Sequence, residues 1–302
     1  MSPAAGRYEL RPQSTAEILD VAFQLLKENF ALLGGLSLLG QLPTVAVFMS
    51  FSWLLDPIAI QRGELPDIGA LFLVVIGFYL LGMLLLMPFV VGSITAAIGD
   101  LYLGAEVTFE TAARRGLERM LPLAITYIIF TVVNVAALLV GVVVAGALFI
   151  GGAALVQSSA ISGLLLVIAV LAGIPAVICV SMLLAFMPGL LAAVVVFEEE
   201  SLFQAVLRTW LLVGSALWRT IGIAVTVYII VLVAPAGVQL VIGEIPVLGA
   251  LLWGAVQAIC QAYLFTATVV VYFDMRCRNE AFDLEHLAQM VEGRERTVAP
   301  IR

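Results

Sequence analysis

The composition of this 302-residue chain excludes an ordinary soluble domain. Hydrophobic residues make up 63% and charged residues 12%, against about 25% charged residues in average globular proteins, and the mean hydropathy is +1.16. The formal net charge of −7 does not identify a partner, because in a membrane protein the side on which each charge falls matters more than the sum. We therefore expect a polytopic helical membrane protein.

The first predicted element is an amphipathic helix from Ser14 to Asn29 that lies on the membrane surface. Apolar residues recur at helical spacing on one side of it, and charged residues occupy the other side. Ser14 and Glu17 form a capping box at its start. The first span, Phe30 to Leu55, follows directly. Because the polar start of the chain lacks the pattern of a cleaved signal peptide, we expect this span to act as the insertion signal.

The longest uncharged stretch runs from Met120 to Phe197 and predicts two of the spans. Before it, the second span extends from Ile68 to Ile98, and another surface helix extends from Phe109 to Met120. The third and fourth spans, Leu121 to Val156 and Leu164 to Phe197, each exceed 30 residues. Since 30 helical residues are about 45 Å long and the hydrocarbon layer is about 30 Å thick, these spans must tilt, kink or protrude.

The last part of the chain repeats the same order of elements. A capped surface helix from Ser201 to about Trp218 precedes the fifth and sixth spans, Ile221 to Ile242 and Val247 to Phe273. The charged tail that follows predicts a short amphipathic helix from Asp283 to Val291.

A surface helix followed by a hairpin of two spans thus occurs three times, over residues 14–98, 108–197 and 201–273. Units of the same topology imply a pseudo-symmetry axis along the membrane normal. The predicted fold class is all-α, with six transmembrane helices in three hairpins, each preceded by an amphipathic cytoplasmic interfacial helix. We expect a single integral membrane domain over 1–302, with a cytoplasmic tail over 274–302.

The distribution of basic residues predicts the orientation of the chain. Six spans place both termini on one side, and that side contains every lysine and arginine except Arg62. Basic residues are retained on the cytoplasmic side of membrane proteins, so both termini are expected in the cytoplasm.

The interiors of the predicted spans contain no ionisable side chain. Ion-coupled transporters usually keep such a residue in the membrane, so this class is disfavoured. Amide side chains remain, among them Asn134, Gln257 and Gln261. These amides would either hydrogen-bond between helices or line a polar path in a passive transporter or channel subunit.

Candidate catalytic groups are few. The single histidine, His286, cannot form a metal cluster or a catalytic dyad, and three cysteines do not form a disulfide framework. Asp100, Glu198 and Asp274 each follow a span and would be the carboxylates of an intramembrane lipid enzyme, a weaker hypothesis because helix-boundary charges explain them equally well. We expect no enzyme activity, cofactor or metal.

The surface helices provide the candidate binding site. Their arginines lie where anionic headgroups would meet them, and tryptophan suits the membrane interface, although plain topology anchoring is an alternative. The candidate lipid- or partner-binding residues are Arg114, Arg115, Arg119, Arg208, Trp210, Trp218, Arg219, Arg276 and Arg278.

Three stretches of the chain carry a family resemblance. They contain Leu10-Arg11-Pro12 with Glu17-Ile18-Leu19-Asp20, then Leu207, Arg208, Trp210, Trp218 and Arg219, and finally Tyr272, Asp274, Arg276, Arg278, Glu280 and Phe282. Together they resemble stand-alone bacterial proteins of the glycerophosphoryl diester phosphodiesterase membrane domain family. Thr209 departs from the usual serine, and Ala281 from a common glycine. Fused members of that family carry a soluble phosphodiesterase domain, whereas only a short tail follows the last span here, so the resemblance implies the membrane module without the enzyme.

The sequence therefore predicts a non-enzymatic protein of the bacterial inner membrane that acts as an envelope or lipid-associated scaffold. Its expected partners are membrane phospholipids with anionic headgroups, and either a partner membrane protein or further copies of itself, but no nucleic acid. The alternative is the passive transporter or channel subunit described above.

Overall fold

The computed structural model describes residues 10–54, 68–156, 178–200, 202–242, 246–282 and 284, and these residues form helices and no strands. Six of the described helices are long and apolar enough to cross a membrane: Phe30–Val47, Val75–Tyr102, Phe109–Ala136, Ile178–Glu198, Leu217–Val238 and Leu251–Glu280. The predicted all-α class is confirmed, and six such helices are typical of a multi-pass membrane protein.

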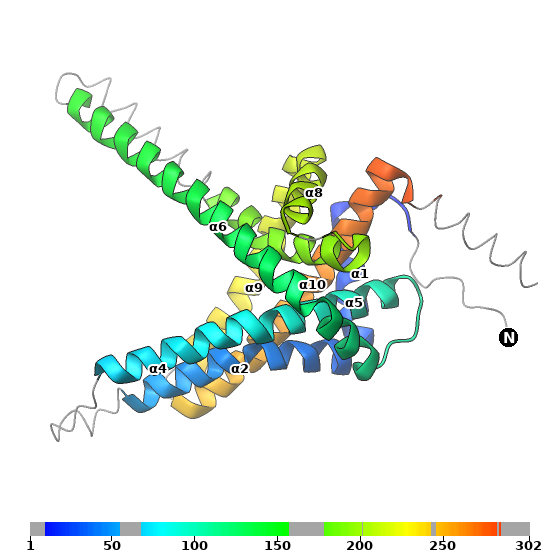
Figure 1. The fold of residues 1–302 in the computed structure, drawn as a ribbon, viewed down its shortest axis with the longest axis horizontal. Helices are drawn as coiled ribbons and strands as arrows, with labels where there is room; N and C mark the ends of the chain where they lie inside the picture. The colour runs from blue at the N-terminus through cyan, green and yellow to red at the C-terminus, as the bar shows by residue number, and fades with distance from the viewer. Residues whose placement is uncertain are drawn as a thin grey trace, which may run out of the picture.

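Figure 1 shows the arrangement of the described helices. A helix over 178–193 precedes the second of two π-helical turns. The other elements are α1 (Thr15–Glu28), α2 (Phe30–Leu54), α4 (Ile68–Leu81), the π-helical turn η1 (Gly82–Leu86), α5 (Met87–Tyr102), α6 (Phe109–Val156), the π-helical turn η2 (Val194–Glu198), α8 (Leu202–Ser215), α9 (Leu217–Ile242) and α10 (Pro246–Glu280).

The start of α1 contains the predicted capping box. The Ser14 hydroxyl accepts a hydrogen bond from the Glu17 backbone N–H at 3.3 Å, and the Glu17 carboxylate accepts one from the Ser14 N–H at 2.6 Å. This second bond, together with Arg11 at 2.8 Å, lowers the pKa of Glu17 to about 2. The carboxylate is therefore ionised at neutral pH and holds the first turn of α1.

The second span is continuous from α4 through η1 to α5, with the Met87-Pro88 pair directly after the π-helical turn. Proline has no N–H for the regular helical bond, and a π-helical turn adjusts the ladder next to it. Gly82 in this turn allows α2 to approach closely, because a Cβ there would lie 2.5 Å from Cγ of Pro43.

The structure corrects three predicted boundaries. The expected break between the surface helix ending at Met120 and the third span is absent, because α6 runs unbroken from Phe109 to Val156. A helix satisfies its own backbone groups, so it continues into the membrane without a turn. The helix predicted from Ser201 to Trp218 ends instead at Ser215. The sixth span continues as α10 to Glu280, beyond the predicted end at Phe273.

Some predicted features lie outside the described residues. These features are the start of the fourth span, over 164–177, and the tail helix predicted over 283–291, of which only Leu284 is described.

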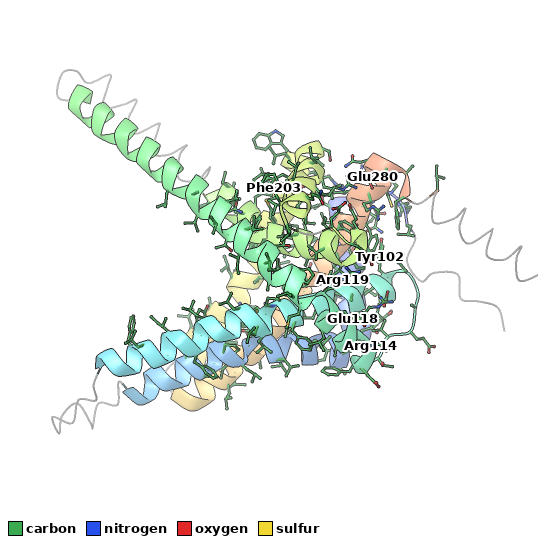
Figure 2. All side chains as sticks on the ribbon, viewed as in Figure 1. Tyr102, Arg114, Glu118, Arg119, Phe203 and Glu280 are labelled. Atoms are coloured by element: carbon green, nitrogen blue, oxygen red, sulfur yellow. The ribbon has the colours of Figure 1, made fainter. Side chains whose placement is uncertain are left out.

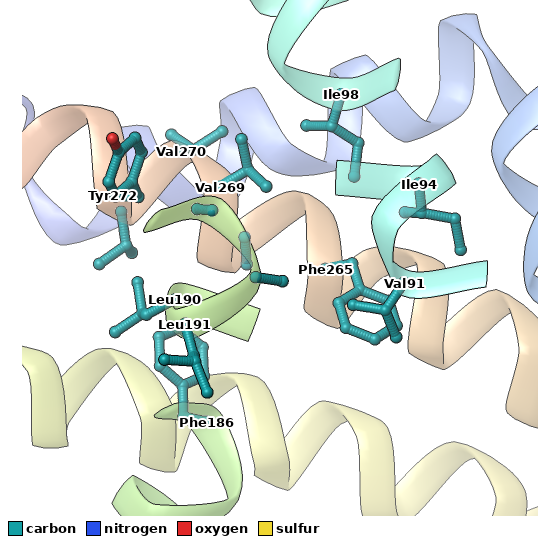
Figure 3. Close-up of a cluster of buried hydrophobic side chains, with 14 of the residues drawn as sticks. Val91, Ile94, Ile98, Phe186, Leu190, Leu191, Phe265, Val269, Val270 and Tyr272 are labelled. Carbon is teal, nitrogen blue, oxygen red and sulfur yellow. The ribbon is translucent and has the colours of Figure 1, made fainter. Parts of the chain in front are cut away.

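The apolar core includes side chains of α1, α2, α6, α8 and α9, and its centre is formed by the second helix of each predicted hairpin (Figure 3). Among the labelled side chains are Val91, Ile94 and Ile98 of α5, Phe186, Leu190 and Leu191 of the helix over 178–193, and Phe265, Val269, Val270 and Tyr272 of α10. Small residues allow these helices to pack closely, since a Cβ on Gly189 would lie 2.5 Å from the Thr268 hydroxyl. The contacts of the core helices also cross the predicted repeats, because α5 packs on α6 and α10 packs on α2.

Candidate functional site at the polar end

Within the part of the chain that the structure describes, the charged side chains gather at one end, called the polar end here. The start of α1, the end of α5, the first turns of α6, α8 and the end of α10 all lie there (Figure 1). In Figure 2 the labelled Tyr102, Arg114, Glu118, Arg119 and Glu280 mark this end. α1 and α8 run across the direction of α2 and α4 in the same view.

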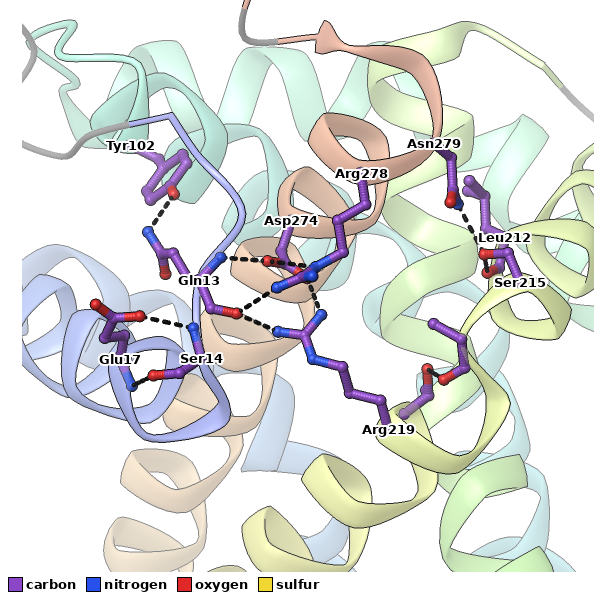
Figure 4. A network of polar contacts seen from close by, with 12 residues as sticks. Gln13, Ser14, Glu17, Tyr102, Leu212, Ser215, Arg219, Asp274, Arg278 and Asn279 are labelled. Atoms are coloured by element: carbon purple, nitrogen blue, oxygen red, sulfur yellow. Dashed lines mark hydrogen bonds and ion pairs between the residues drawn. The ribbon is translucent and has the colours of Figure 1, made fainter.

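Asp274 is the centre of the first polar network (Figure 4). Its side chain is 1% exposed and accepts hydrogen bonds from the Gln13 backbone N–H at 2.7 Å, from Nε of Arg278 at 3.1 Å, and from Arg219. The carbonyl oxygen of Gln13 in turn accepts bonds from both arginines. The side-chain amide of Gln13 donates to the Tyr102 hydroxyl at 3.1 Å. The network therefore joins the segment before α1 to α5, α9 and α10.

Glu198 is the centre of the second network. Its carboxylate accepts hydrogen bonds from Nε of Arg208 at 2.7 Å and from the Tyr272 hydroxyl at 2.9 Å. Arg208 also pairs with Glu280, whose other oxygen pairs with Arg276 at 3.0 Å. The hydrogen bond to Glu198 raises the pKa of Arg208. This network fastens α8 to α10 and to η2.

Stacked aromatic rings lie beneath both networks. Phe273 is 2% exposed, and its ring centroid lies 5.3 to 5.8 Å from those of Tyr102, Phe197, Tyr272 and Phe282. The guanidinium of Arg276 sits 4.3 Å from the Phe282 centroid, which is a cation–π contact. The rings come from α5, η2 and α10 and from Phe282, the second residue after α10, so this end of the core is closed by aromatic packing.

Ala281, which turns the chain at the end of α10, has an unfavourable backbone conformation. Its φ is 51°, in the left-handed region that costs a side chain about 1 to 2 kcal/mol. Replacing Ala281 by glycine is therefore expected to raise the free energy of unfolding by about 1 kcal/mol. The control is Ala255→Gly in the interior of α10, which should lower it by about as much. Denaturant titration in detergent micelles measures both, and equal effects of the two variants would contradict the prediction.

Three of the predicted binding arginines form exposed ion pairs on α6. Arg114 pairs with Glu118 at 3.1 Å, and their side chains are 81% and 59% exposed. The other pairs join α6 to neighbouring elements and are Arg115 with Asp100 and Arg119 with Glu199. Exposed pairs of this kind contribute about 0 to 1 kcal/mol each, so their arginines can change partner at little cost.

The other four predicted arginines, Arg208, Arg219, Arg276 and Arg278, belong to the two networks. Each of them bonds to more than one group. Among the described residues, the structure thus separates the predicted cations into these four, which each bond to several groups, and the three arginines of α6, which each pair with one carboxylate. Of the two predicted tryptophans, Trp210 is 38% exposed and Trp218 is 83% exposed.

The three carboxylates that follow spans are all bound in the structure. Each bond links the end of one predicted repeat to the beginning of the next: Asp100 with Arg115, Glu198 with Arg208, and Asp274 with the N–H of Gln13. The third of these links connects the last repeat back to the first, which closes a ring.

Two amides of the predicted polar path have different hydrogen-bond partners in the structure. Asn134 donates to the Phe130 carbonyl oxygen of its own helix at 2.7 Å. Gln261 on α10 bonds to Gln41 on α2, which is a contact between helices. Gln257, one turn before Gln261, is half-buried.

Sequence reasoning missed Gln13, Tyr102 and Glu280. Gln13 stands just before the capping box, and its partner Asp274 is 261 positions away. No local pattern marks such a pair. The clearest available signal was the position of Tyr102 and Glu280 at the ends of helices, where polar groups meet the membrane interface.

All three stretches that carry the family resemblance meet at the polar end. Gln13, beside Leu10-Arg11-Pro12, contacts Arg219 and Asp274, and Arg208 contacts Glu280. Thr209 is fully buried, and its hydroxyl donates to the Ala205 carbonyl oxygen at 2.8 Å, a bond that serine makes equally well.

The fold and the polar end define a multi-pass helical membrane protein whose charged side chains bind one another at one end. Within the described ranges, no group of three or more His, Cys, Asp or Glu side chains is placed to hold a metal ion. Comparison with known proteins found no matching family model, no matching curated protein and no matching solved structure.

Proposed function

We propose that this chain is a non-enzymatic scaffold of the bacterial inner membrane, with both termini in the cytoplasm, that binds phospholipid at its polar end. The observation that carries the proposal is the division of the predicted arginines. Four of them each bond to more than one group in the two networks, whereas Arg114, Arg115 and Arg119 each form a single ion pair, with side chains that are 81%, 53% and 29% exposed. A phosphate oxygen can replace a carboxylate oxygen on such an arginine.

Two further observations support a scaffold. The core helices bury apolar side chains against one another along their contact, which favours a packed bundle over a conduit. The carboxylates that a lipid enzyme would use, Asp100, Glu198 and Asp274, are each neutralised by arginine.

We also propose that the chain is a stand-alone relative of the glycerophosphoryl diester phosphodiesterase membrane domain family. The support is that its three motif stretches, far apart in the sequence, are joined by the contacts of the two polar networks. These residues would recur together in relatives because they hold the same helices together. The fold details that go with it are three hairpins, each with an interfacial helix on the cytoplasmic side.

The test of lipid binding replaces Arg114, Arg115 and Arg119 together by glutamine. Each arginine near an anionic surface contributes about 1 kcal/mol, so the affinity for anionic phospholipid is expected to fall at least about tenfold. The measurement is native mass spectrometry of the purified protein after exchange into liposomes containing anionic and zwitterionic lipids, which counts the lipids retained.

The matched control replaces the same three arginines by lysine, which keeps the charge, and should retain most of the lipid. If the glutamine variant keeps as much anionic lipid as the unchanged protein, phospholipid is not bound at these arginines. A partner membrane protein would then be the better ligand for this surface.

A further inference from the structure

α8 differs from the other helices at the polar end in having two apolar faces. One face packs on the protein through Ala205, Val206, Thr209, Leu212 and Val213, all of which are buried. The opposite side of the helix carries large apolar side chains that the protein leaves exposed, with the uncharged Gln204 exposed beside them. The large apolar side chains are Phe203 at 62%, Leu207 at 51%, Trp210 at 38% and Leu211 at 62%, and Trp218 at 83% continues the face onto the start of α9.

The outward faces of the neighbouring helices are different. On α1 the exposed side chains include Asp20, Gln24, Lys27 and Glu28. On the first turns of α6 they include Glu110, Thr111, Arg114, Arg115 and Glu118. Those helices present charges to their surroundings, as a helix next to water does, whereas α8 presents none.

The only charged residue of α8 does not oppose burial in lipid. Arg208 is bound by Glu198 and Glu280, so its charge is neutralised on the protein side of the helix. The hydroxyl of Thr209 is bonded within the helix. The exposed face of α8 is therefore free of ionised groups, and water is a poor solvent for it.

The position of α8 indicates what covers this face. With 14 residues α8 is about 21 Å long, too short to cross a hydrocarbon layer of about 30 Å. It runs across the direction of α2 and α4 (Figure 1), and a single residue, Ala216, separates it from the apolar helix α9. Its middle is held to the end of α10 through Arg208 and Glu280. A helix placed in this way lies at the boundary of the membrane, parallel to its plane.

We propose that α8 is inserted in one leaflet, with Phe203, Leu207 and Leu211 in contact with phospholipid acyl chains. Trp210 and Trp218 then lie at the level of the headgroups, where indole rings are favoured. This deepens the proposed lipid association and rests on it, because α8 contacts the acyl chains while Arg114, Arg115 and Arg119 contact the headgroups. The other surface helices, α1 and the first turns of α6, remain on the aqueous side.

The test uses spin labels on the full-length protein in lipid nanodiscs, after Cys179, Cys260 and Cys277 have been replaced by serine. Single cysteines are introduced as Leu207→Cys and Leu211→Cys on α8, and as Gln24→Cys and Lys27→Cys on α1 as controls. Electron paramagnetic resonance then measures the collision rates of each label with oxygen, which concentrates in lipid, and with a water-soluble nickel chelate.

We expect the ratio of oxygen to nickel collisions to be several-fold higher at 207 and 211 than at 24 and 27. A ratio at 207 and 211 equal to that at the control positions would overturn the insertion. Dipolar broadening between labels on α8 of two molecules would also overturn it, because a second copy would then cover the face.

A second measurement avoids changes to the buried cysteines. A variant that keeps Trp218 alone, with Trp53, Trp210 and Trp253 replaced by phenylalanine, should lose fluorescence in liposomes of lipids brominated on the acyl chain near the headgroup. Undiminished fluorescence would contradict the proposal. These outcomes are independent of the arginine variants, so α8 can fail this test while headgroup binding stands, and the reverse also holds.

Discussion

Replacing Asp274 by asparagine is expected to lower the free energy of unfolding by about 3 kcal/mol. The substitution keeps the shape of the side chain but removes the charge that Arg219 and Arg278 share, while its exposed fraction is only 1%. Both guanidiniums then lose the carboxylate that neutralises them. Removing one partner of a buried ion pair costs about 3 to 5 kcal/mol, and the partial exposure of the two arginines places this case at the lower end.

The control for this prediction is Asp100→Asn. Asp100 also follows a predicted span, but it pairs with one arginine instead of two, and the side chain of that arginine, Arg115, is 53% exposed. Loss of this pair is expected to cost no more than about 1 kcal/mol. Unfolding by denaturing detergent in mixed micelles, followed by circular dichroism, measures both variants. Equal losses would show that Asp274 does not hold the polar end together.

The second large effect is expected from Gly116→Ala at the contact of α5 with α6. A Cβ at this position would lie 1.9 Å from the Ser93 hydroxyl oxygen and 2.7 Å from the backbone oxygen of Phe89. The hydroxyl can rotate away, but the backbone of α5 cannot. The two helices must therefore separate, at a cost of about 1 to 3 kcal/mol in the free energy of unfolding.

Gly35→Ala on α2 is the matched control, because nothing lies within 4 Å of the Cβ that it adds. Alanine favours a helix interior by about 1 kcal/mol over glycine, so this variant is expected to be more stable than the unchanged protein. The two substitutions are chemically identical and should change stability in opposite directions in the same unfolding measurement. A stabilising effect of Gly116→Ala would mean that α5 and α6 do not pack this closely.

The sequence predicted the elements whose signal is local. The capping box at Ser14 and Glu17 depends on residues three positions apart, and the structure confirms it. Six long apolar stretches predicted six helices long enough to cross a membrane, because backbone groups in hydrocarbon must bond within their own segment. The least accurate predictions were boundaries. At Met120 and Phe273 the side chains change from polar to apolar or the reverse, but the backbone hydrogen bonding of α6 and α10 continues.

The candidate site was predicted in its residue types and not in its contacts. The sequence predicted arginines of the surface helices as binding residues, but it could not distinguish Arg114, which is exposed, from Arg219, which is bound to a buried carboxylate. The sequence could not distinguish the two faces of α8 either. Val206 and Leu207 are adjacent apolar residues, and the structure buries Val206 and exposes Leu207. Burial of one face depends on which helix packs beside it.

The amino-acid sequence by itself therefore determined that the chain is helical, that it has six apolar segments of membrane length, and where its charges stand along it. Hydrophobicity and helix capping act between residues a few positions apart, so one sequence suffices to read them. Only the tertiary structure decided which charges neutralise each other. Arg219 and Asp274 are 55 positions apart and Gln13 and Asp274 are 261 apart, and such pairs exist only because the packing of α9, α10 and the segment before α1 brings them together.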